Sequence, residues 1–60
     1  MKVLQEQRAE HEFGVAQFYE RQHQSASARL YYQGIVEQYP KTSWAPKAVA
    51  RLQALGGTTP

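Results

Sequence analysis

The sequence predicts an all-α fold, in which an antiparallel helical hairpin is followed by a third, capping helix. Larger apolar residues recur at helical spacings along three segments of the chain. Short polar or proline-containing stretches separate these segments, and none of the segments reads as a strand. The 60 residues are expected to form one small domain.

The first helix is expected from Val3 to Gln22, a segment without proline. Its glutamates and glutamines favour helix and are expected to solvate the outer face. Gly14 lies inside the pattern. The predicted core stripe consists of the larger side chains at helical spacing, namely Leu4, His11, Val15, Phe18 and Tyr19.

The second helix is expected from Ser25 to Tyr39, after a joint over residues 22–27 that has no large apolar anchor. Ser25 or Ser27 is expected to cap it. It ends before Pro40, because the residue preceding a proline avoids the helical conformation. Its predicted stripe consists of Ala28, Tyr31, Tyr32, Ile35, Val36 and Tyr39. Leu30 and Gly34 fall on the opposite side, where a leucine beside a glycine indicates a contact surface.

The third helix follows a turn and cap at residues 41–43 and carries Pro46 in its first turn, where a missing amide hydrogen costs little. Gly56 and Gly57 are expected to stop this helix, and residues 57–60 to form a loose tail. The predicted stripe consists of Trp44, Ala48, Val49, Leu52 and Leu55.

Composition restricts the function classes. The net charge is +2, and the seven Lys and Arg residues are spread along the chain. No apolar run approaches the roughly 20 residues of a membrane-spanning helix. There is no cysteine, so neither a disulfide nor a thiolate metal site can support the small core. Assembly with another chain or with flanking repeats is therefore expected.

Residues 9–42 resemble a tetratricopeptide repeat, a helical hairpin of about 34 residues. Val15, Ala16 and Tyr19 stand at its leucine, small and aromatic positions, and Glu12 replaces its tryptophan. On the second helix the matching small, aromatic and terminating residues are Ala28, Tyr32 and Pro40. The resemblance implies a single repeat at 9–42, preceded by an extension of the first helix at 1–8 and followed by a capping helix at 43–56.

More narrowly, Phe18-Tyr19, Tyr39-Pro40-Lys41-Thr42 and Ala48 through Leu52 are similar to repeats of the outer-membrane assembly lipoprotein BamD family. This resemblance implies a protein-binding scaffold in the periplasm or cell envelope of a bacterium, as part of an outer-membrane protein assembly factor. The family carries a glycine in the first joint, whereas residues 21–24 contain none. A second possibility is therefore that the first helix continues into the second, with helices exchanged between copies.

Catalytic and ligand motifs are incomplete. Val15 stands where a zinc-peptidase helix beginning at His11 needs its second histidine, and His23 is too distant to share an ion. The hydroxyl residues lie where caps belong, and no glycine loop precedes a helix. No cofactor, metal or enzymatic activity is expected. Dispersed basic residues and tyrosines on core stripes disfavour nucleic-acid binding.

Two functions remain open from the sequence. The preferred one is a protein-binding module, whose inner surface presents Phe13, Gln17 and Arg21 at spacings of four. Phe13 is expected either to be an exposed interface anchor or to pack against a preceding repeat or the start of its own helix. The alternative is a structural unit that forms homo-oligomers through the open ends of the stack. The candidate partner-binding residues are Phe13, Gln17, Arg21, Leu30, Tyr31 and Trp44.

Overall fold

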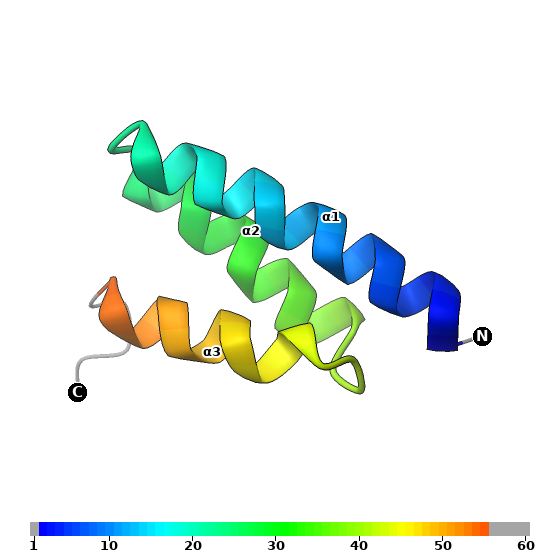
Figure 1. Ribbon diagram of the computed structural model, residues 1–60. Coiled ribbons are helices and arrows are strands. Elements are labelled where there is room, and N and C mark those ends of the chain that lie inside the picture. The colour runs from blue at the N-terminus through cyan, green and yellow to red at the C-terminus, as the bar shows by residue number, and fades with distance from the viewer. Residues whose placement is uncertain (1, 56–60) are drawn as a thin grey trace.

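The computed structural model describes residues 2–55 and consists of three helices. They are α1 (Lys2–Arg21), α2 (Ser25–Gln38) and α3 (Trp44–Ala54). Each helix reverses the direction of the one before it, and α2 lies between α1 and α3 (Figure 1). No strand occurs within the described range, so the all-α prediction is confirmed. The expected stop at Gly56 and Gly57 and the tail at 57–60 lie outside the described residues.

A tight turn separates α1 from α2, so the two do not form one continuous helix. His23 adopts a left-handed conformation, with a φ of 62°. The amide of Gln24 donates to the carbonyl of Tyr19, and the amide of His23 donates to the carbonyl of Glu20. These two bonds form the Schellman motif that ends many helices, in which the left-handed residue is usually glycine. His23 thus performs the role of the glycine that the sequence lacks here.

Neither Ser25 nor Ser27 caps α2, contrary to the expectation. The N-cap position is occupied by Gln24, whose side chain makes no capping hydrogen bond. The chain enters α2 directly after the Schellman turn. The helix therefore begins at Ser25, and both serines lie inside it.

The turn between α2 and α3 is held by Thr42 and by α1. The hydroxyl of Thr42 is buried and donates to the carbonyl of Tyr39 at 2.8 Å. Ser43 occupies the N-cap of α3 but does not cap it through its side chain. Its amide and hydroxyl instead donate to the two carboxylate oxygens of Glu6, at 3.0 and 2.9 Å. A carboxylate from α1 therefore lies at the start of α3, where negative charge is favoured.

The core is small and rich in alanine. Tyr32 and Ile35 of α2 are its largest fully buried side chains, and Phe13 of α1 is 8% exposed. The ring of Phe13 meets Tyr32 edge to face at 5.2 Å between centroids and lies 5.1 Å from the ring of Trp44. Five buried alanines let the helices approach closely around these rings, namely Ala9, Ala16, Ala28, Ala45 and Ala48.

The core face of α1 differs from the predicted stripe. Leu4 and Phe18 are each 51% exposed, and His11 is exposed. The buried positions are instead Ala9, Phe13 and Ala16, again at spacings of four and three. The predicted stripe followed other large side chains, whereas α1 faces the other two helices through two alanines and the ring of Phe13.

Phe13 and Val49 also require correction. Phe13 is not an exposed anchor, and it packs against α2 and α3 instead of a preceding repeat or the start of α1. Val49, placed on the stripe of α3, is 38% exposed, whereas Ala45 is buried. By contrast, Leu30 is 70% exposed, as expected from its position opposite the core stripe. None of the helices in residues 2–55 has the length and apolar character to cross a bilayer.

Candidate functional site

A groove runs between the C-terminal half of α1 and α3, with a volume of about 270 Å³. Gln17, Glu20 and Arg21 line it from α1, and Arg51 lines it from α3. Gln17 and Arg21 are two of the residues that the sequence predicted to bind a partner. Both are exposed, so they are accessible to a molecule lying in the groove.

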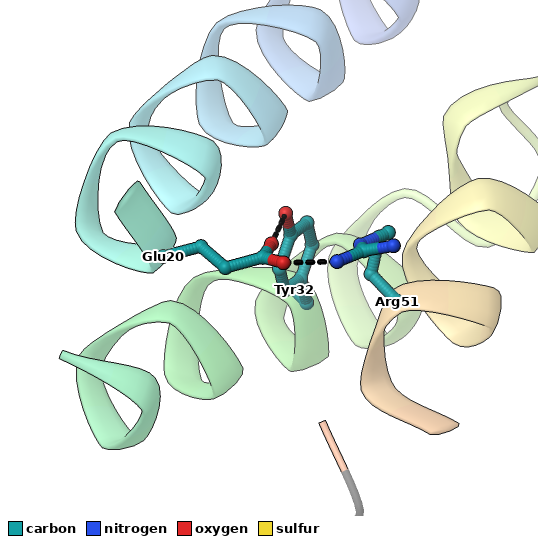
Figure 2. Close-up of polar contacts among 3 residues, drawn as sticks. All are labelled: Glu20, Tyr32 and Arg51. Atoms are coloured by element: carbon teal, nitrogen blue, oxygen red, sulfur yellow. Dashed lines mark hydrogen bonds and ion pairs between the residues drawn. The ribbon is translucent and has the colours of Figure 1, made fainter. Parts of the chain in front are cut away.

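Glu20 is the centre of a polar network that joins all three helices (Figure 2). The hydroxyl of Tyr32, from α2, donates to Oε1 of Glu20 at 2.8 Å. The guanidinium of Arg51, from α3, donates through Nη2 to Oε2 of the same carboxylate. Each carboxylate oxygen therefore accepts a bond from a different helix, which fixes α1 and α3 relative to α2.

The network shifts the pKa of each member. The hydrogen bond from Arg51 is the main cause that lowers the pKa of Glu20, and partial burial opposes it. Burial, followed by the bond to the Glu20 carboxylate, raises the pKa of Tyr32 to about 12. The bond to Glu20 also raises the pKa of Arg51. At neutral pH the network therefore contains one carboxylate, one guanidinium and one neutral phenol.

The described residues that line the groove carry more positive than negative charge. Arg21 and Arg51 are opposed by one acid among them, Glu20, and Gln17 is neutral. The side chain of Arg51 is 41% exposed although it pairs with Glu20. Because a guanidinium has five N–H donors in a planar fork, one bond to Glu20 leaves Arg51 with capacity for a second acceptor. The groove is suited to a partner that offers carboxylate or carbonyl oxygens.

The other predicted partner-binding residues do not join this groove. Phe13 lies in the core, and Trp44 is half-buried against it, with the Lys47 ammonium 4.3 Å from the centre of the indole ring. Leu30 and Tyr31 line a different hollow, to which Glu12 of α1 also contributes. Tyr31 stacks there on Tyr19 of α1 at 5.5 Å. The six residues are therefore divided among the groove, the core and a second surface.

Sequence reasoning missed Glu20, Tyr32 and Arg51 as members of one group. Glu20 was assigned to the solvated face of the first helix, and Tyr32 to the core for its ring alone. One signal was available, because Glu20 lies four residues after Ala16 and so continues the row of Ala9, Phe13 and Ala16. The pairing with Arg51 spans 31 residues along the chain, and no local spacing predicts it.

The described residues contain no cluster of three histidine or acidic side chains that could hold a metal ion. Compared with models of protein families, with curated proteins and with solved structures, the sequence matches none of them.

Proposed function

We propose that this chain is a protein–protein interaction module, a tetratricopeptide-like scaffold that binds an extended peptide in the groove between α1 and α3. The observation that carries the proposal is the convergence of Gln17 and Arg21 with Arg51 across that groove. Exposed amide and guanidinium groups on two helices offer hydrogen-bond donors to the carbonyls and carboxylates of a peptide.

The hydrogen-bond network in the wall of the groove favours binding over catalysis. Glu20 is held by Tyr32 and Arg51, so its carboxylate is engaged in positioning the walls. Preorganised walls reduce the ordering that binding requires, which increases affinity without new contacts. The proposed role is therefore binding alone, without catalysis.

The preferred ligand is a peptide with acidic side chains, because arginines outnumber acids among the described residues that line the groove. The resemblance to the BamD family motivates an extension of the proposal, in which the client belongs to a bacterial envelope or outer-membrane assembly pathway. That extension depends on the resemblance and not on the charge of the groove.

The test is a titration of the isotope-labelled chain, followed by amide chemical shifts. The probe is a capped hexapeptide of alternating glutamate and alanine, compared with the same peptide carrying glutamine for glutamate. We expect the amide chemical shifts of Gln17, Arg21 and Arg51 to change with the acidic peptide and to change less with the neutral peptide. Arg21→Gln should weaken binding several-fold, because Arg21 lies outside the Glu20 network.

The matched control is Arg29→Gln, which removes an exposed arginine of α2 that does not line the groove. It should bind the acidic peptide as the original chain does. If both variants lost the same affinity for the acidic peptide, the effect would come from the overall charge of the chain and not from the groove. Absence of shifts at the groove residues with millimolar acidic peptide would refute the proposed ligand class.

A further inference from the structure

Two adjoining hollows lie on the part of the molecule formed by α1 and α2 without α3. The first, of about 230 Å³, is lined by Glu12 of α1 and by Leu30, Tyr31, Gly34, Gln38 and Tyr39. The second, of about 260 Å³, adds Leu4, Gln7, Arg8 and His11 of α1. Both hollows include Glu12 and Tyr39, so they form one continuous surface, which we call the outer face.

Gly34 lines the first hollow of the outer face, and no contact with residues 2–55 requires a glycine there. A Cβ built on Gly34 meets no atom of the described residues within 4 Å. Glycine inside a helix costs about 1 kcal/mol relative to alanine, so its presence here has no internal compensation. Leu30, one turn earlier on the same side of α2, is 70% exposed. A position without a side chain beside an exposed leucine gives a surface into which another helix can pack.

The charges of the outer face are complementary to themselves. Arg8 and Glu12 lie one turn apart on α1, and neither makes an ion pair with a residue that the structure describes. They are opposite in sign and add to zero. A two-fold axis that crosses α1 between them would bring Arg8 of each copy beside Glu12 of the other. An identical face therefore satisfies these charges without any further partner.

We propose that the outer face binds a second copy of this chain through a two-fold symmetric contact. Leu30 of each copy enters the hollow beside Gly34 of the other, which removes two exposed leucines from water. Arg8 and Glu12 form two crossed pairs at the rim and set the register. None of the residues lining the groove between α1 and α3 takes part, so the dimer presents two peptide grooves. The inference does not rest on the proposed peptide binding.

The test measures molar mass by sedimentation equilibrium from micromolar to millimolar chain. We expect the mass to rise from 6.9 kDa to a plateau at twice that value. Leu30→Asp should raise the dissociation constant more than about tenfold, equivalent to about 1.4 kcal/mol. Val49→Asp is the matched control, because Val49 is an exposed apolar residue of α3. It should leave the dissociation constant unchanged.

A charge exchange tests the symmetry without touching Leu30. Arg8→Glu and Glu12→Arg should each weaken the dimer, because each places like charges across the axis. The double variant should recover the original affinity, since the crossed pairs are restored with reversed sign. A constant mass of 6.9 kDa at millimolar concentration, growth without a plateau, or a double variant weaker than both single variants would each overturn the two-fold contact.

Discussion

Replacing Tyr32 by phenylalanine isolates the hydrogen bond that connects α2 to the Glu20 carboxylate. The ring of Tyr32 is completely buried and packs edge to face on Phe13, and phenylalanine preserves that contact. The hydroxyl, which donates to Glu20 at 2.8 Å, is lost. Arg51 still pairs with the carboxylate, so Glu20 is not left without a partner.

The expected destabilisation follows from the acceptor. A hydrogen bond to a charged group contributes about 1.5–3 kcal/mol, and partial access of water to Glu20 brings the expected value to the lower end of that range or just below it. We therefore expect Tyr32→Phe to lower the free energy of unfolding by about 1–2 kcal/mol at pH 7. In a domain of this size, that corresponds to a fall of roughly 4–16 °C in the melting temperature.

The hydroxyl of Tyr32 should also make the stability of the chain depend on pH in the alkaline range. The folded chain raises the pKa of Tyr32 from 10.0 to about 12, so the folded state holds its proton where the unfolded state has lost it. The stabilisation that comes from this difference in pKa is fully present below pH 10 and decreases as the pH rises toward 12. Between pH 8 and pH 11, the original chain should lose roughly 1 kcal/mol of stability that Tyr32→Phe does not lose.

Thermal and urea unfolding followed by circular dichroism at several pH values measures both effects. Tyr31→Phe is the control, because Tyr31 is 36% exposed and its hydroxyl makes no hydrogen bond among residues 2–55. The reasoning would be refuted if Tyr32→Phe matched the original chain at pH 7 and both lost the same stability by pH 11.

Three further substitutions test the core, the first turn and the ion pair. Phe13→Ala should cost about 3–5 kcal/mol, as much as a core of this size supplies, and circular dichroism should show loss of helix; a retained melting transition near that of the original chain would contradict the packing. His23→Gly should raise the free energy of unfolding by about 1 kcal/mol, because glycine adopts the left-handed conformation without strain; His23→Ala is the control, and an equal gain from alanine would exclude this explanation. Glu20→Gln should cost at most about 1 kcal/mol at pH 7, because Arg51 is partly exposed. The pKa of Glu20 is lowered, so its stabilisation is present above the unfolded value and is lost as pH falls; the original chain should therefore lose more stability than Glu20→Gln in urea melts between pH 6 and pH 3.

The number, order and approximate bounds of the helices are determined by local sequence. Proline after Tyr39 ends α2, and apolar spacings of three and four indicate each helical segment. These signals depend only on residues close together in the chain, so one sequence is enough to identify them. The exposure of Leu30 was predictable for the same reason, since the opposite side of α2 carries the larger apolar stripe.

Only the tertiary structure decided which side of α1 enters the core and which polar groups meet. Alanines at positions 9 and 16 face the core because two helices must approach there, whereas the larger Leu4 and Phe18 remain half exposed. The joining of Glu20 to Arg51, and of Glu6 to Ser43, depends on how three helices pack across 31 and 37 positions of sequence. Helical periodicity specifies an angle around one axis, but the neighbour that each angle faces is set by the packing of all three helices together.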